Sequence, residues 1–321
     1  MIDTDKIKCF FAFSGYDSQA IALQNCNIDY ECVGWSEIDK FAIKAHNALF
    51  PEDKNKNYGD ITKINWESVP DFDFFTYSFP CSDISRIGSQ KGLKKDSKNK
   101  SSLLWECQKA ISIKKPRVLM MENVKDLVSE KFMPDFLEWD LWLRKQGYTN
   151  YSKVINSTDF DIPQSRQRVF MISILGDSWF CFPQEKRLTK TVFDFLEENI
   201  DEKYYLSDTL IKYVLNEDNS SKSFKGDLER DLDRKICYTI TRSYYKNQKM
   251  TVSSYYRTNG RIRKLTPREC FRLMGVDESR IDIIQSTGLS NTQQYKLVGN
   301  SIVVNVLEAI FTNLFKIWKQ I

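Results

Sequence analysis

Histidine is almost absent from this sequence. His46 is the only one in 321 residues, and it lies in a stretch with helical spacing that predicts a surface position. Sites that depend on imidazole, such as Cys–His hydrolases and histidine-rich metal centres, are therefore disfavoured. The eight cysteines are scattered and contain no CxxC pair, which argues against a disulfide framework and a zinc finger. We expect no bound metal.

The sequence also lacks signals for export and for membrane insertion. No apolar run approaches the length needed to cross a bilayer, and the first six residues, MIDTDK, have neither the basic start nor the apolar stretch of a signal peptide. A cytoplasmic protein is expected. With 41% hydrophobic and 28% charged residues, the composition is that of an ordinary globular chain, long enough for two lobes.

The stretch around Cys81 combines strand and loop signals with a reactive side chain. Residues 71–75 are apolar and aromatic and predict a buried strand, which Pro80 ends. Cys81 then lies at the carboxyl end of a strand, where open α/β sheets bind ligands. The loop after it carries six Lys or Arg between residues 86 and 100, against one acid. This stretch alone fits a nucleophile facing a polyanion as well as an inert core cysteine.

Alternating strand and helix signals predict a largely parallel sheet covered on both sides. Gly15 forms a turn after the first strand, and Glu37 ends the second, as in a βαβ nucleotide site. Glu122 follows another strand and arrives at the same sheet edge as Cys81, which favours an active site. Arg166 and Arg168 lead into a later strand, where their spacing predicts a shared face. The expected strands are 7–13, 30–36, 71–75, 116–121, 148–156 and 164–173, and the expected helices include 101–115 and 132–146.

Residues 180–263 break this alternation and are expected to form an inserted second lobe. From 191 to 233 acids outnumber bases by twelve to five, whereas 234–268 holds ten Lys or Arg and no acid, interleaved with tyrosines. A basic tract of this length favours contact with nucleic acid. Thr266 and Pro267 predict a helix start, and Gly299 is expected in a turn before a final amphipathic helix.

Taken in order, these features resemble the DNA (cytosine-5) methyltransferase family, and the resemblance covers nearly the whole chain. It implies an α/β fold: a Rossmann-like S-adenosylmethionine-dependent methyltransferase domain with a small inserted target-recognition domain. The catalytic domain would comprise 1–179 and 264–321, with a C-terminal helix that returns to complete the cofactor pocket, and the recognition domain 180–263. The segments that carry the resemblance are Phe13-Ser-Gly15, Glu37, Asp60, Ser78-Phe-Pro-Cys81, Gln90-Lys-Gly92, Glu122-Asn-Val124, Gln164-Ser-Arg166-Gln-Arg168, Lys264-Leu-Thr266-Pro-Arg-Glu269 and Gly299-Asn300-Ser301.

The resemblance also implies a reaction and the catalytic roles. A methyl group passes from S-adenosylmethionine to carbon 5 of a cytosine flipped out of a short, specific duplex DNA sequence, through a covalent bond between Cys81 and C6. Glu122 would protonate or hydrogen-bond N3, which requires that its pKa be raised. Arg166 would hold the cytosine O2, and Arg168 would support the site.

Cofactor and DNA contacts are assigned on the same ground. Asp17 stands where the family usually has a second glycine; its carboxylate would either crowd the methionine end of the cofactor or bind the ammonium group. Ser82 stands where Gln is frequent. The residues assigned to the cofactor are Phe13, Ser14, Gly15, Tyr16, Asp17, Glu37, Ile38, Asp60, Ile61, Pro80, Asn300 and Ser301, and those assigned to DNA are Ser85, Arg86, Gln90, Lys91, Thr239 and Arg242.

Three other functions are compatible with parts of the sequence. An RNA cytosine-5 methyltransferase would use the same scaffold, since cationic faces also bind A-form RNA. A non-catalytic DNA-binding module has no need of the intact Cys81 and Glu122, and a Cys-dependent hydrolase is disfavoured by the single histidine. We expect a monomeric bacterial or phage modification enzyme, with a cognate restriction endonuclease acting separately.

Overall fold

A computed structural model describes residues 6–81, 84, 100–215, 232–250 and 252–321. The predicted DNA-binding residues Ser85, Arg86, Gln90 and Lys91, together with Ser82, lie outside the described residues. The chain divides into two compact units. The first unit comprises Met1–Ile155, Gln167–Gln184 and Val306–Ile321, and the second comprises Asn156–Arg166 and Glu185–Asn305. These bounds describe packing; the functional division at 180 and 263 stays a prediction.

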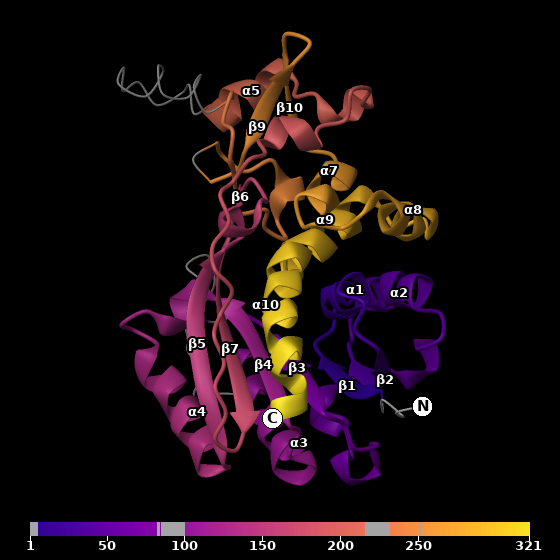
Figure 1. The fold of residues 1–321 in the computed structure, drawn as a ribbon. Coiled ribbons are helices and arrows are strands. Elements are labelled where there is room, and N and C mark those ends of the chain that lie inside the picture. Colours follow the sequence, from indigo (N-terminus) through magenta and orange to yellow (C-terminus); the bar gives the residue numbers. More distant parts are fainter. Residues whose placement is uncertain (1–5, 82–83, 85–99, 216–231, 251) are drawn as a thin grey trace. The chain divides into compact units, whose positions relative to one another are not determined.

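The first unit is built on a sheet of six described strands in the order β2-β1-β3-β4-β7-β5 (Figure 1). β1 pairs in parallel with β2 and β3, and β3 pairs in parallel with β4. β7 then runs antiparallel to β4. The prediction of a largely parallel α/β sheet is confirmed. The strands are β1 Ile7–Ala12, β2 Tyr30–Ser36, β3 Phe74–Tyr77, β4 Val118–Val124, β5 Tyr148–Asn156 and β7 Gln167–Leu175.

Helices cover both faces of this sheet because alternate side chains of a strand point to opposite sides. On one face Phe74 of β3 contacts Phe311 and Phe315 of α10, with ring centroids 5.6 and 5.8 Å apart. On the other face the hydroxyl of Tyr77 accepts a hydrogen bond of 3.2 Å from the indole of Trp139 in α4. The helices of this unit are α1 Ser18–Asn25, α2 Lys40–Leu49, α3 Cys107–Lys114, α4 Met133–Lys145 and α10 Val304–Ile317.

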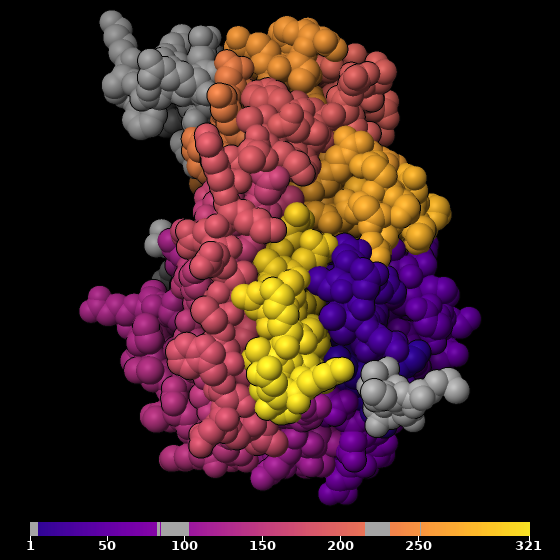
Figure 2. Space-filling model, viewed as in Figure 1, coloured from indigo at the N-terminus to yellow at the C-terminus, as the bar shows by residue number. Residues whose placement is uncertain are grey.

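The C-terminal helices are longer and more apolar than the sequence analysis indicated. Asn291–Gln320 is long and apolar enough to cross a membrane by length and composition, although no such stretch was expected. It is not one continuous helix, because regular structure stops at residues 301–303. α10 packs its aromatic side on the sheet and is joined to α1 by a hydrogen bond of 2.6 Å from Asn25 to Glu308, where the two segments adjoin in Figure 2. These contacts are those of a core helix.

The second unit consists of short helices and two small strand pairs. β6 pairs in parallel with β8, and β9 forms an antiparallel hairpin with β10. The predicted helix start at Thr266 is confirmed: its side chain and that of Glu269 form a capping box at the start of α7. The elements are β6 Gln164–Ser165, β8 Cys237–Tyr238, β9 Tyr255–Thr258, β10 Arg261–Lys264, α5 Asp208–Leu215, α7 Pro267–Arg272, α8 Glu278–Ser286 and α9 Asn291–Asn300.

A fully buried ion pair joins the β9–β10 hairpin to α7. The Arg263 guanidinium donates two hydrogen bonds, of 2.7 and 2.8 Å, to the Glu269 carboxylate, and both side chains are 0% exposed. The same carboxylate accepts from the backbone N–H groups of Thr266 and Glu197 at 2.8 and 2.7 Å. Arg263 also donates to the Thr258 hydroxyl at 3.1 Å. The charged pair is thus surrounded by matched hydrogen-bonding groups.

Candidate active site

The turn between β1 and α1 has an unusual backbone. Phe13, Gly15 and Asp17 all have left-handed φ angles, of 56°, 61° and 69°. Glycine adopts this conformation readily, whereas it is rare for a phenylalanine. The Gly15 N–H donates to the Glu37 carboxylate at 3.0 Å, which fastens the turn to the end of β2. Backbone strain of this kind concentrates at functional sites.

Glu37 and Ile38 present two different chemistries beside this turn. Besides the bond from Gly15, the Glu37 carboxylate accepts from the backbone N–H groups of Ile38 and Asp39 at 2.8 and 2.9 Å. Its two oxygens are therefore fixed in direction. The Ile38 side chain is 73% exposed, and an exposed apolar side chain beside an anchored carboxylate suits a ligand with an apolar ring and a polar sugar.

The remaining residues of the first unit that were predicted to bind the cofactor differ in their exposure. The Asp60 carboxylate accepts from the N–H and the hydroxyl of Thr62 at 3.0 and 2.8 Å, and these bonds lower the pKa of Asp60. Ile61 and Tyr16 are buried, with exposed fractions of 4% and 1%. Ser14 is also buried and Pro80 is partly exposed. Ile61 and Tyr16 thus belong to the buried core.

Asp17 has buried partners that the sequence did not indicate. Its Oδ1 accepts from the Ala20 N–H at 3.0 Å, which caps α1, and its Oδ2 lies 3.5 Å from Nε2 of His46. Burial raises the pKa of Asp17, and the neighbouring His46 opposes this rise. His46 itself is 1% exposed and stacks on Trp35 with ring centroids 3.7 Å apart. The prediction that His46 lies at the surface is wrong, because it sits on the buried face of α2.

Cys81 follows β3 in a loop that is tied to the neighbouring strand. The amide of Asn123, at the end of β4, donates to the Phe79 carbonyl at 2.9 Å, and the Ile84 N–H donates to the Cys81 carbonyl at 3.0 Å. The Cys81 side chain is partly exposed. Cys81 therefore follows β3, and Glu122 lies near the carboxyl end of the adjacent strand β4, which continues beyond residue 121, where the sequence indicated its end. Sequence reasoning gave Asn123 no role, although it directly follows Glu122.

Glu122 is paired with Arg168. The antiparallel register of β4 and β7 sets Val124 opposite Arg168, so that Nε of Arg168 lies 3.2 Å from Oε1 of Glu122. Both side chains are mostly buried, with exposed fractions of 9% for Glu122 and 16% for Arg168. A carboxyl group, a guanidinium and a thiol-bearing loop are thus gathered in the first unit.

Arg166 does not share the surroundings of Arg168, although the spacing predicted a shared face. The strand is interrupted at Arg166, between β6 and β7, and this residue belongs to the second unit. Its guanidinium donates to the backbone carbonyls of Ile240, Gly299 and Ser301 at 3.0, 3.1 and 2.5 Å. The Arg166 side chain thus binds the backbone of three separate residues of the second unit.

The other predicted residues of the second unit lie around the same segments. Thr239 donates its hydroxyl to the Ser165 carbonyl at 2.6 Å. Arg242 and Asn300 are exposed, and Ser301 is partly exposed. Gly299 lies inside α9, not in the turn that was expected. The second unit therefore offers exposed polar groups at both Arg242 and Asn300.

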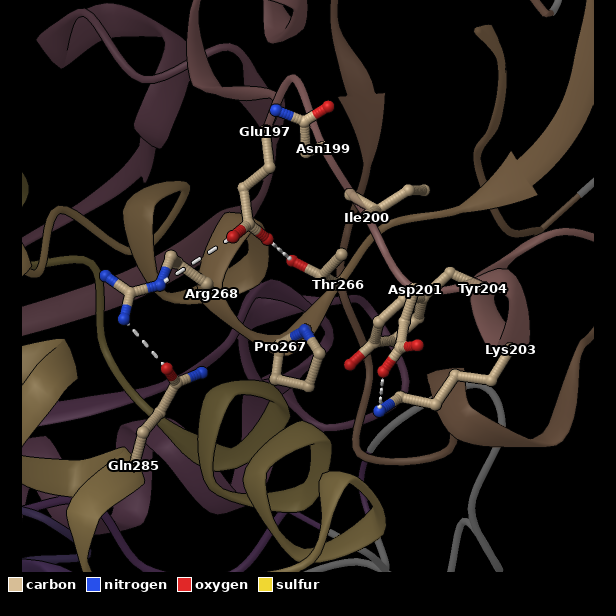
Figure 3. A pocket seen from close by; sticks show the side chains of 10 residues that line it. All are labelled: Glu197, Asn199, Ile200, Asp201, Lys203, Tyr204, Thr266, Pro267, Arg268 and Gln285. Carbon is tan, nitrogen blue, oxygen red and sulfur yellow. Dashed lines mark hydrogen bonds and ion pairs between the residues drawn. The ribbon is translucent and has the colours of Figure 1, made fainter. Parts of the chain in front are cut away.

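A cavity of about 240 Å³ lies elsewhere in the second unit (Figure 3). Its polar groups are largely satisfied by one another: Thr266 donates to Glu197 at 2.5 Å, and Arg268 donates to Gln285 at 2.9 Å. It contains none of the residues predicted for catalysis, cofactor or DNA. Within the described ranges no group of three His, Cys, Asp or Glu side chains could hold a metal ion. The cavity is lined by Glu197, Asn199, Ile200, Asp201, Lys203, Tyr204, Thr266, Pro267, Arg268 and Gln285.

Comparison with known proteins agrees with this geometry. Residues 7–316 match a family model described as C-5 cytosine-specific DNA methylase. The chain is 40% identical to the type II methyltransferase M2.ScrFI of Lactococcus lactis subsp. cremoris, over 97% of this chain and 99% of that protein. It is 31% identical to the type II methyltransferase M.HhaI of Haemophilus parahaemolyticus, over 94% and 92%. Its fold is similar to the crystal structure of the S. pombe Dnmt2 methyltransferase, with a TM-score of 0.76 at 22% identity, over 97% and 99%.

Proposed function

Since this chain belongs to the C-5 cytosine-specific DNA methylase family, we propose how its own residues carry out the reaction of that family. The protein is a DNA (cytosine-5-)-methyltransferase, which transfers a methyl group from S-adenosylmethionine to carbon 5 of cytosine in DNA. The proposal rests above all on one observation: the Cys81 loop is anchored by Asn123, next to the Glu122–Arg168 pair.

The β1–α1 turn and the end of β2 fit S-adenosylmethionine. Gly15 has open space where a Cβ would stand, Glu37 holds two oriented oxygens, and Ile38 offers an apolar surface. When bound, the cofactor supplies an electrophilic methyl group. We assign Glu37 to the ribose hydroxyls, Ile38 to the adenine face and Asp60 to the adenine edge, since carboxylates accept from hydroxyl and amino groups. The further assigned residues are Phe13, Ser14, Tyr16, Asp17, Ile61, Pro80, Asn300 and Ser301.

Cys81 acts as the nucleophile in this proposal. Its thiolate forms a bond to C6 of the flipped cytosine, and Glu122 gives N3 a proton or a hydrogen bond, so that the ring becomes an enamine with a nucleophilic C5. After methylation a base removes the C5 proton, the electrons of the C5–H bond form the C5=C6 double bond, and the Cys81 thiolate leaves C6 with the electrons of the C6–S bond. A proton given to N3 returns to Glu122 in the same step. We assign no residue to that last base.

Arg168, rather than Arg166, is the arginine that we assign to the cytosine O2. Its guanidinium lies against Glu122, the group that faces N3 of the same ring. Arg166 already donates to three backbone carbonyls. The proposal therefore reverses the two roles that the sequence suggested.

Residues 180–263 form the target-recognition domain in this proposal, with Thr239 and Arg242 facing the DNA. Arg242 is exposed and its guanidinium can read a guanine edge or bind a phosphate. The loop residues Ser85, Arg86, Gln90 and Lys91 would add contacts. We further propose that the enzyme acts as a monomer in the cytoplasm, alongside a separate cognate restriction endonuclease.

Trapping the covalent intermediate tests the proposal. The enzyme is incubated with S-adenosylmethionine and a mixed-sequence duplex pool containing 5-fluorocytosine, then run on a denaturing gel. An adduct is expected that disappears with Cys81→Ser and persists with Cys181→Ser, a matched control at an exposed cysteine. Sequencing the trapped DNA gives the target. An adduct formed only with structured RNA supports the RNA methyltransferase, and no adduct despite measured cofactor binding supports a binding module.

A further inference from the structure

Two buried side chains hold the peptide groups of Ile240 from opposite sides. Oε1 of Gln164 accepts from the Ile240 N–H at 3.0 Å, and Nη1 of Arg166 donates to the Ile240 carbonyl at 3.0 Å. Gln164 is 0% and Arg166 3% exposed. Between them, the Ser165 carbonyl accepts from the Thr239 hydroxyl at 2.6 Å. Residues 164–166 thus grip 239–240 at three successive points.

The same side chains also hold two other parts of the second unit. Nε2 of Gln164 donates to the Leu273 carbonyl, just after α7, at 2.9 Å. Nη2 of Arg166 donates to the carbonyls of Gly299 and Ser301, at the end of α9. Charge-assisted hydrogen bonds inside a protein are strong and directional. We call Gln164 and Arg166 the bracket, because they fix the segment 239–242 to two helix ends.

Gly299 also helps to fix the segment 239–242, in addition to Gln164 and Arg166. A Cβ at this position would lie 2.0 Å from the backbone nitrogen of Arg242 and 2.3 Å from the carbonyl carbon of Thr241. Only glycine lets α9 and the segment 239–242 approach this closely. The backbone of Arg242 is therefore held against α9, while its side chain remains exposed.

We propose that the bracket determines target-sequence specificity without touching DNA. It rests on the proposed function, in which Thr239 and Arg242 face the target. With the backbone of 239–242 fixed, these two side chains meet every target in one arrangement, and a wrong base leaves a donor or acceptor unpaired. With the bracket loosened, the segment shifts to suit other bases, so that non-target sequences become better substrates. Gln164 and Arg166 are positioning residues in this scheme.

The test compares kcat/KM on a target duplex with kcat/KM on duplexes carrying one changed base pair. Arg166→Lys keeps the positive charge but cannot bond all three carbonyls in the same geometry. We expect the ratio of target to changed-target rates to fall about tenfold or more, as loss of a charged hydrogen bond allows. Both duplexes are compared at the same saturating S-adenosylmethionine concentration, because Ser301, which accepts from Arg166, is also assigned to the cofactor. Arg144→Lys, at an exposed arginine paired with Asp140 in α4 of the first unit, is the matched control.

A second variant keeps the proposal testable if Arg166→Lys fails to fold. Gln164→Glu retains an acceptor for the Ile240 N–H but loses the donor to Leu273, and a fall in the same ratio is expected. Lower thermal stability with an unchanged ratio in either folded variant would overturn the proposal, since that is the result of a purely structural role. Failure of the proposed function is seen separately: Arg242→Ala would then leave both the DNA KM and the ratio unchanged.

Discussion

A single substitution at the buried Glu269 carboxylate is expected to destabilise the second unit strongly. Four N–H groups converge on it: two from Arg263, one from Thr266 and one from Glu197. In Glu269→Gln one oxygen becomes an NH₂ group, so that two of these donors face another donor. The Arg263 guanidinium is at the same time left as a buried charge without a counterion.

The expected loss of stability follows from these contacts. Breaking a buried ion pair by removing one charge costs about 3–5 kcal/mol in the free energy of unfolding. Replacement of both charges by apolar groups is often neutral, but not here. Arg263→Met with Glu269→Leu leaves the N–H groups of Thr266 and Glu197 without their acceptor, at about 1–3 kcal/mol each. The double variant should therefore also be less stable than the parent protein.

The assay can separate the two units. All seven tryptophans lie in segments of the first unit, so tryptophan fluorescence follows that unit, whereas far-ultraviolet circular dichroism follows both. In a urea titration, Glu269→Gln should lower the urea concentration at which the second unit unfolds. Circular dichroism should then change at a lower urea concentration than tryptophan fluorescence. A shift below about 1 kcal/mol would refute the reasoning, as would a double variant more stable than the parent.

Three further substitutions probe the first unit. Burial raises the pKa of Asp17, so the contribution of this residue to the free energy of unfolding falls as pH rises above about 4. Asp17→Asn should remove that fall. Urea unfolding measured from about pH 4 to about pH 8 would contradict this if the parent protein and the variant showed the same pH dependence. Ile38→Ser should raise the KM for S-adenosylmethionine about tenfold with kcat unchanged, as lost apolar burial predicts; an unchanged KM in steady-state assays would argue against adenine packing there. Asn123→Ala removes the hydrogen bond to the Phe79 carbonyl and should lower kcat about tenfold. Cofactor affinity, measured by calorimetry, should stay the same. An equal loss of kcat and of cofactor affinity would point to a general folding defect.

Local patterns predicted the sheet well. β2 and β5 have the bounds that the sequence indicated, because both contain aromatic and β-branched residues and are preceded by turn residues. Cys81 follows β3 as Pro80 indicated, and Glu122 lies at the carboxyl end of the adjacent parallel strand β4, within the strand and not after it. These features depend on residues that are close together in the chain, so they can be predicted from local sequence patterns.

Features that depend on distant partners could not be predicted in this way. His46 has helical neighbours, but its burial is set by Asp17 and Trp35, which belong to other elements of the fold. Gly299 resembles a turn glycine, yet its role is to admit the backbone of Arg242. The different surroundings of Arg166 and Arg168 arise from a break in the strand between them, which no spacing rule indicates.

The order of segments along the chain has a consequence during synthesis on the ribosome. The sheet face that carries Phe74 is covered by Phe311 and Phe315 of α10, yet these two residues are made after every residue of the second unit. The strands therefore emerge with an apolar face that stays uncovered while 185–305 are translated. The second unit can complete its packing first, although it begins later. Apolar surface exposed during translation is prone to aggregation, so we expect this face to be the part of the nascent chain that chaperones bind.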